Sequence, residues 1–88
     1  MTGSAIKTGQ EAVAVRGSTH GSYAVNAAIS QKLKSVMRGS DGWSNLSASQ
    51  KESLDLMSTK IARILAGDPN FEEHWIDLEG YSSLGKSK

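Results

Sequence analysis

The chain has 88 residues and a formal net charge of +1 at pH 7, so it is long enough for one small domain, and its bulk charge gives no reason to expect nucleic acid or an anionic membrane as a partner. It contains no cysteine, which excludes a disulfide scaffold, a thiol nucleophile and cysteine-ligated zinc. No apolar run approaches the roughly 18 residues that a membrane span needs, and we therefore expect a cytoplasmic protein.

Two parts of the chain differ in their pattern. Residues 1–15 are interpreted as an N-terminal tail that is partly disordered, because the first nine are mostly small and polar. QEAVAV, at residues 10–15, is compatible with a short helix. Residues 16–85 carry a periodic apolar pattern and are predicted to form a single α-helical domain.

The first long helix is predicted over residues 22–38. Gly39 follows the basic Arg38, which is a common way for a helix to end. The apolar residues of this stretch recur at steps of three and four, as one face of a helix requires. They are Val25, Ile29, Leu33 and Val36.

The second helix has the clearest start. Ser47-x-x-Gln50 and Ser49-x-x-Glu52 both fit a capping box, in which side chains and backbone of the first turn satisfy each other. Gly67 is predicted to end this helix. The apolar stripe between these two signals consists of Leu54, Met57, Ile61, Ile64 and Leu65.

The third helix is predicted to begin at Asp68-Pro69, because Asp is a preferred N-cap and Pro is favoured at the first helical position. Glu72 and Glu73 then lie near the positive end of the helix dipole. No stretch alternates as a strand does. The fold class is therefore all-α, a small bundle of about three helices. Because a single core of this size is marginal, we expect oligomerisation to complete it.

Two acidic pairs have helical spacing. Glu52 and Asp55 are three residues apart in the second helix, and Glu73 and Asp77 are four apart in the third. If these helices pack antiparallel, the four carboxylates could face one cleft and hold Mg²⁺, which prefers oxygen ligands. The alternative is that both pairs are solvated surface groups.

Four further residues are candidates for ligand binding. Lys60 and Arg63 could hold phosphate oxygens, or could pair with surface carboxylates. Asn26 lies inside the apolar stripe of its helix and should either touch a ligand or make an interhelical hydrogen bond. His20, between Gly-flanked loop residues, could be a base or ligand, or could cap the helix that follows.

The third helix also carries candidate interface residues. Trp75 and Tyr81 are interpreted as core or interface anchors, and Ile76, between acidic residues on the outer face, indicates a contact with a partner. His74 is expected to be packed or partly exposed, because no second His stands at metal-ligand spacing. The chain has no Ser-His-Asp order and no Gly-rich phosphate loop, so nucleophilic catalysis is not expected.

Three segments together resemble a family of small, uncharacterised phage and prophage proteins. They are THGSYAVNAAISQKLK at 19–34, ESLDLMSTKIARILAGDPN at 52–70 and HWIDLEGYSSL at 74–84. Members of that family share a "THG-aromatic-xxN" segment, then "KIxRILxGD", then "HWxDIxGY". The resemblance covers about residues 16–84, and it implies an α-helical fold and a phage origin.

That family is in turn similar, more distantly, to the MazG-like all-α nucleoside triphosphate pyrophosphohydrolases, which hold magnesium with carboxylates from an EExxE motif and an ExxD motif. Glu52-x-x-Asp55 matches ExxD by spacing. The EExxE motif is matched imperfectly, by Glu72, Glu73 and Asp77, and these come after ExxD in the chain rather than before it. Residues 22–38, which should carry that motif, contain no carboxylate.

Two local departures from the small phage family also stand out. Ser22 occupies a position that is often acidic in the family, and Glu79 occupies one that is usually small. Glu79 therefore places a charge beside Gly80, which we interpret as a helix glycine that allows close packing.

These observations give two hypotheses of different classes. The first is a homo-oligomeric binding protein that engages a host protein and needs no cofactor. The second is a reduced, Mg²⁺-dependent MazG-like pyrophosphohydrolase, or a protein that binds a nucleotide without turnover. The enzyme requires the four carboxylates to converge, within one chain or across a subunit boundary, whereas the binding protein allows them to point apart.

Overall fold

The computed structural model describes residues 19–87. In this part of the chain three long helices follow one another, with a short 3₁₀ helix in the first connection and no strand, which confirms the all-α prediction. The predicted tail at residues 1–15 lies outside the described residues. None of the helices in residues 19–87 is long and apolar enough to cross a membrane. The elements are α2 (Tyr23–Arg38), η2 (Asp41–Asn45), α3 (Ala48–Ala66) and α4 (Glu72–Lys86).

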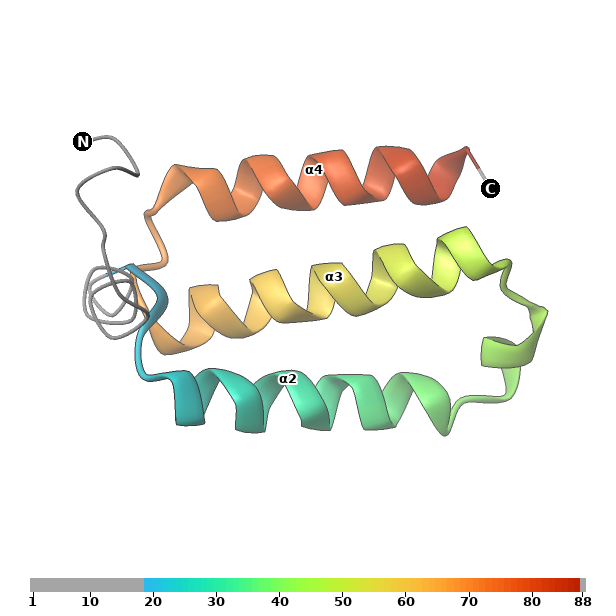
Figure 1. The fold of residues 1–88 in the computed structure, drawn as a ribbon, viewed down its shortest axis with the longest axis horizontal. Coiled ribbons are helices and arrows are strands. Elements are labelled where there is room, and N and C mark those ends of the chain that lie inside the picture. The colour runs from blue at the N-terminus through green and yellow to red at the C-terminus, as the bar shows by residue number, and fades with distance from the viewer. Residues whose placement is uncertain (1–18, 88) are drawn as a thin grey trace, which may run out of the picture.

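Helix α3 lies between α2 and α4 and packs against both (Figure 1). Contacts between the helices show that each neighbouring pair is antiparallel. Arg38 meets Asp55 while Lys34, one turn earlier in α2, meets Thr59, one turn later in α3. The three helices therefore run up, down and up, with α3 as the shared partner.

The predicted capping box starts α3. The Ser47 hydroxyl accepts a hydrogen bond from the Gln50 backbone N–H at 3.1 Å, and the Gln50 side-chain oxygen accepts one from the Ser47 N–H at 3.0 Å. Of the two overlapping motifs, Ser47-x-x-Gln50 is thus the one that forms the cap. Gly67 follows the helix as predicted, and its N–H donates to the Arg63 carbonyl.

Helix α4 begins later than Asp68-Pro69 predicts. Its first residue is Glu72, with Phe71 at the N-cap position. The reason is local, because the Asp68 carboxylate accepts a hydrogen bond from the Asn70 N–H at 2.9 Å and so closes a turn before the helix. Glu72 and Glu73 still occupy the first turn, as expected.

The residues between the helices are small. Ala62 is the only apolar residue in positions 19–87 that is fully buried. The other buried residues are Ser30 on α2, Ser53 and Ser58 on α3, and His74 on α4. Short side chains at these positions allow the helix axes to approach closely, and they leave little apolar surface hidden.

The close-packing glycine of α4 is not the one predicted. A Cβ added at Gly80 would meet nothing within 4 Å, whereas one at Gly85 would lie 3.1 Å from the Ser53 Cβ. The interpretation of Gly80 as a packing glycine is therefore wrong. It lies on a side of α4 that faces away from α3, and Gly85 lies on the side that touches α3.

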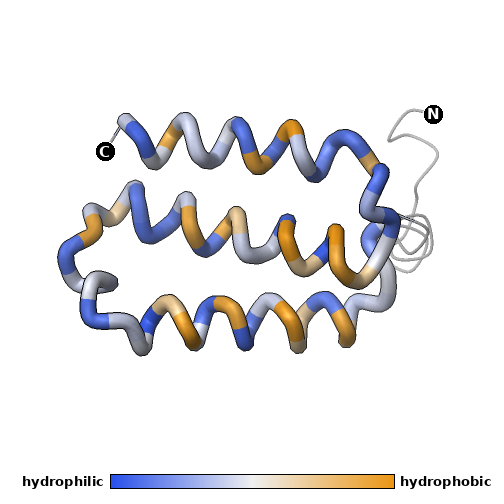
Figure 2. The backbone as a smooth tube through the Cα atoms, turned by 180° about the vertical axis from the view of Figure 1, so that it is seen from behind, coloured by the Kyte–Doolittle hydropathy of each residue, from blue (hydrophilic) through white to orange (hydrophobic). Residues whose placement is uncertain are grey.

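The large apolar side chains remain largely uncovered. Orange apolar segments recur along all three helices in Figure 2, as the sequence period requires. Eight large apolar side chains in residues 19–87 are nevertheless exposed, and the other large ones are only partly buried. The eight exposed ones are Tyr23, Val25, Val36, Ile61, Leu65, Trp75, Ile76 and Leu84.

Two glycines give opposite predictions for stability. A Cβ at Gly67 would collide with backbone atoms of residues 19–21, including the Thr19 carbonyl oxygen. We expect Gly67→Ala to lower the free energy of unfolding by about 1–3 kcal/mol, as overpacking does. Gly80→Ala, in open space inside a helix, should raise it by about 0.5–1 kcal/mol. Urea denaturation of both variants checks this, and equal effects would contradict the described packing.

Candidate functional site

A pocket of about 320 Å³ opens between α2 and α3, next to the loop that precedes α2. Asn26, Ser30 and Lys34 line it at steps of four, so they form one ridge of α2. Thr59 and Arg63 form the matching ridge of α3. The remaining lining residues are His20, Gly21, Tyr23, Ala27 and Gln31.

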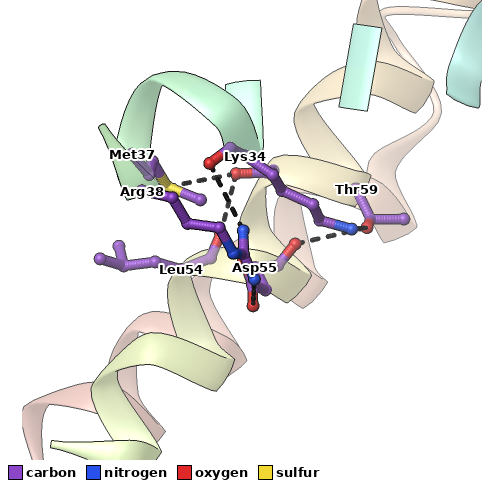
Figure 3. Close-up of polar contacts among 7 residues, drawn as sticks. Lys34, Met37, Arg38, Leu54, Asp55 and Thr59 are labelled. Atoms are coloured by element: carbon purple, nitrogen blue, oxygen red, sulfur yellow. Dashed lines mark hydrogen bonds and ion pairs between the residues drawn. The ribbon is translucent and has the colours of Figure 1, made fainter. Parts of the chain in front are cut away.

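The pocket contains two cations and no carboxylate. The Lys34 ammonium donates to the Thr59 hydroxyl at 3.1 Å, a contact drawn in Figure 3. Arg63 has no ion-pair partner among residues 19–87. With Lys34 and Arg63 on facing helices and no acidic residue in the lining, the pocket favours an anion.

Asn26 holds the loop at the mouth of the pocket. Its amide nitrogen donates to the His20 carbonyl and, at 3.1 Å, to the Ser22 carbonyl. The predicted interhelical hydrogen bond is therefore wrong, because both partners precede α2 in the chain. The Asn26 side-chain oxygen is buried and has no hydrogen-bond partner. Such a group costs stability unless something donates to it.

His20 belongs to an aromatic cluster. Its ring centroid lies 4.5 Å from that of His74, edge to face, and 6.0 Å from that of Phe71. Phe71 and His74 are themselves 4.9 Å apart. The cluster joins the loop before α2 to the start of α4, and it fixes the ring of one pocket residue.

Among residues 19–87, His74 is the largest side chain that is fully buried, with 1% exposed. Burial lowers the pKa of its imidazole below the ordinary value of 6.5, and the nearby Thr19 backbone partly opposes this. Neither ring nitrogen has a partner at full hydrogen-bond geometry. A buried imidazole of this kind is held in its neutral form.

Two of the four predicted metal ligands are occupied by cations from neighbouring helices. Asp55 accepts two hydrogen bonds from the Arg38 guanidinium, at 3.0 and 2.8 Å (Figure 3). Asp77 lies 2.6 Å from the Lys60 ammonium. The hydrogen bond from Lys60 lowers the pKa of the Asp77 carboxyl. Both aspartates thus join α3 to a neighbour.

The other two predicted ligands are exposed and lie at opposite ends of the α3–α4 pair. Glu52 lies beside Ser53, which touches Gly85 near the end of α4, whereas Glu73 lies in the first turn of α4. Twelve residues of helix from 73 to 85 correspond to about 18 Å. Within residues 19–87 no three acidic or His side chains are grouped for a metal ion. The four carboxylates do not converge in one chain.

Three of the four residues predicted to bind a ligand line one pocket, and ligand binding itself stays a prediction. His20, Asn26 and Arg63 line the same pocket, whereas Lys60 turns towards α4 and pairs with Asp77. Sequence reasoning missed Lys34. The signal was available, because Lys34 follows Asn26 by eight residues and so lies on the same side of the helix.

The predicted interface residues lie on α4. Trp75 is 52% exposed, and its indole N–H donates to the Pro69 carbonyl at 2.8 Å. Ile76 is 55% exposed and borders a shallow hollow with Glu79 and Gly80. Tyr81 is half-buried. Trp75 and Ile76 thus remain available to a partner, and Tyr81 is partly used within the chain.

Comparison of the chain with protein-family models, with curated proteins and with solved structures found no match. The resemblance to small phage proteins therefore stays a prediction. Function has to be argued from the geometry of the pocket and of the exposed surfaces.

The buried imidazole predicts that stability falls in mild acid. Because the folded-state pKa of His74 is depressed, its contribution is complete above the unfolded pKa, about 6.5, and is lost progressively as the pH falls from there through the lower folded-state pKa. Urea midpoints measured from pH 8 to pH 5 should decrease. In His74→Phe, which keeps an aromatic ring, the decrease should be smaller. An identical pH dependence in both proteins would contradict this role.

Proposed function

We propose that this protein acts by binding other proteins, as a homo-oligomer. The observation that carries the proposal is the mismatch between its buried and exposed apolar groups. One apolar residue, Ala62, is fully buried in residues 19–87, while eight large ones are exposed. A chain of this length with so thin a core needs an additional surface to cover its apolar groups.

Four of the exposed side chains form two pairs, each on one face of its own helix. Val25 and Val36 are eleven residues apart, which is about three helical turns, and Ile61 and Leu65 are one turn apart. The ridges that line the pocket lie on other faces of the same helices. We refer to Val25, Val36, Ile61 and Leu65 as the apolar face.

The occupant that fits the apolar face is a second copy of the chain. The thin core leaves the folded chain in need of additional stabilisation at all times. A second copy can provide it, because other copies of the chain are always present at the protein's own concentration. A two-fold dimer places the same apolar face against itself, so that apolar groups meet apolar groups. In this arrangement both pockets remain open on the outer surfaces.

The outer edge of α4 would then be free to bind a different protein. Ile76 follows the buried His74 by two residues, so it points away from α3. It is the apolar centre of the shallow hollow that includes Glu79 and Gly80. The resemblance to phage proteins implies that the partner is a host protein, and an exposed Ile with polar neighbours suits a transient contact.

The alternative function, a reduced Mg²⁺-dependent pyrophosphohydrolase, has weaker support. Within one chain Asp55 and Asp77 are paired with Arg38 and Lys60. A magnesium site would require a second copy to supply carboxylates and these ion pairs to break. The geometry therefore favours a binding protein over an enzyme.

Leu65→Glu tests the dimer. Leu65 is 66% exposed in the single chain, so a charge there would be harmless to a monomer but would be buried in the dimer. We expect light scattering after size exclusion to give a dimer for the wild type and a monomer for Leu65→Glu.

Ser49→Glu is the matched control for that experiment. Ser49 is also exposed on α3, and its spacing from Ile61 and Leu65 places it on a different side of that helix. It should leave the dimer intact. The proposal would be contradicted if the wild type stayed monomeric over a 100-fold range of protein concentration. It would also be contradicted if both variants dissociated to the same extent.

Ile76 gives a separate prediction about the second partner. A photo-crosslinking amino acid at position 76, in cells of a host in which the protein acts, should give one discrete adduct whose mass is not a multiple of the 9.4 kDa chain. The same amino acid at the exposed position 49 should give none. Adducts that are the same at both positions, or only multiples of the chain mass, would contradict a partner at this edge.

A further inference from the structure

We propose that the pocket between α2 and α3 binds a small phosphate monoester, whose phosphate group is held by Lys34 and Arg63. This inference does not depend on dimer formation. It rests on the charges, the hydrogen-bonding groups and the size of the pocket.

The first observation is which of the cations at the helix contacts have a carboxylate partner. Arg38 is paired with Asp55 at 2.8 Å, and Lys60 is paired with Asp77 at 2.6 Å. The two cations that line the pocket are the exceptions. Lys34 has a hydroxyl partner, and Arg63 has no ion pair among residues 19–87.

Two like charges around one hollow repel each other, and an anion between them removes that repulsion. The guanidinium of Arg63 can offer two parallel N–H donors to phosphate oxygens, and the Lys34 ammonium can add a third donor from the facing helix. A phosphate monoester carries nearly two negative charges at neutral pH. It therefore matches two cations better than a carboxylate does.

The second observation concerns the rest of the ligand. The pocket volume of about 320 Å³ is larger than a bare phosphate ion needs and is at the lower end of small-molecule sites. Tyr23, which is 79% exposed, lines the pocket and offers a ring face to a flat group. The Asn26 amide nitrogen is held by two carbonyl groups of the loop, which fixes the side chain in the wall of the pocket.

The pocket is also prepared for a ligand. The loop that carries His20 is held by Asn26 and by the contacts of the His20 ring with Phe71 and His74. Lys34 is already directed across the helix contact by Thr59. Binding therefore orders few additional groups, which favours affinity for a small ligand.

The test is a titration of the ¹⁵N-labelled protein, followed by NMR, with phenyl phosphate and, as the matched ligand, benzoate. Both carry one phenyl ring, but their charges differ. We expect phenyl phosphate to shift the Asn26 side-chain amide and the Arg63 Nε–H signals saturably, with benzoate binding at least about tenfold more weakly. Inorganic phosphate should shift Arg63 and leave Tyr23 unchanged.

Substitutions assign the phosphate contact. Lys34→Gln and Arg63→Gln should each weaken phenyl phosphate binding about tenfold or more, because each removes a charge-assisted hydrogen bond. Lys32→Gln makes the same charge change on the same helix, at an exposed position outside the pocket lining. It should change the affinity less than about twofold, and Lys34→Arg should restore most of the binding lost in Lys34→Gln.

Three results would overturn the proposal. They are the absence of saturable shifts at 50 mM phenyl phosphate, equal affinity for benzoate, and equal weakening by Lys32→Gln and Lys34→Gln. The same spectra report whether each variant is folded. Because the oligomeric state is measured separately, a failure here leaves the proposed dimer untouched, and a failure of the dimer leaves this site standing.

Discussion

The arrangement of the protein depends on one constraint, which is that α3 packs against a helix on each side. A helix in that position must present two contact surfaces, and in α3 these are built from Ser53, Ser58 and Ala62, whose side chains are short enough for close approach. The cost is that two large apolar residues of α3 remain exposed. Ile61 and Leu65 are left on an open side, which makes association with a second chain part of how the fold is stabilised.

The same constraint explains the separation of charges. Contacts built from small residues give little apolar stabilisation, and each of the two helix contacts has an ion pair at its margin, Arg38–Asp55 and Lys60–Asp77. Partly exposed pairs of this kind add little stability, but they fix the register of the helices because each cation has one carboxylate within reach. Asp55 and Asp77 are thereby used for structure, and Lys34 and Arg63, which have no carboxylate partner among residues 19–87, line the pocket.

Much of the fold could be predicted from local patterns. The capping box of α3, the end of α2 at Gly39 and the acidic first turn of α4 depend on neighbouring residues, and sequence shows such signals directly. The later start of α4 was missed, because the Asp68 carboxylate serves a turn instead of a helix. Which apolar residues are covered could not be predicted, since it depends on two neighbours and not on the period.

The candidate site was predictable only in part, for a related reason. Helical spacing tells which residues share a side of one helix, so Asn26 and Lys34 could have been grouped. It does not tell which side of the facing helix they meet. Lys60 and Arg63 are three residues apart and seemed to be one phosphate-binding pair, yet Lys60 turns to α4 and Arg63 to α2. In a helix that packs between two others, some residues face one neighbour and some face the other. Which residues face which neighbour depends on how the helices pack.

The aromatic cluster connects the pocket between α2 and α3 to helix α4. His20 lines the pocket and its ring packs on His74, which belongs to α4 on the other side of α3. Phe71 completes the cluster at the start of α4. The wall of the pocket therefore cannot move without disturbing a fully buried imidazole. For a protein with so thin a core, this cluster at the loop end of the bundle gives the pocket the rigidity that a binding site requires.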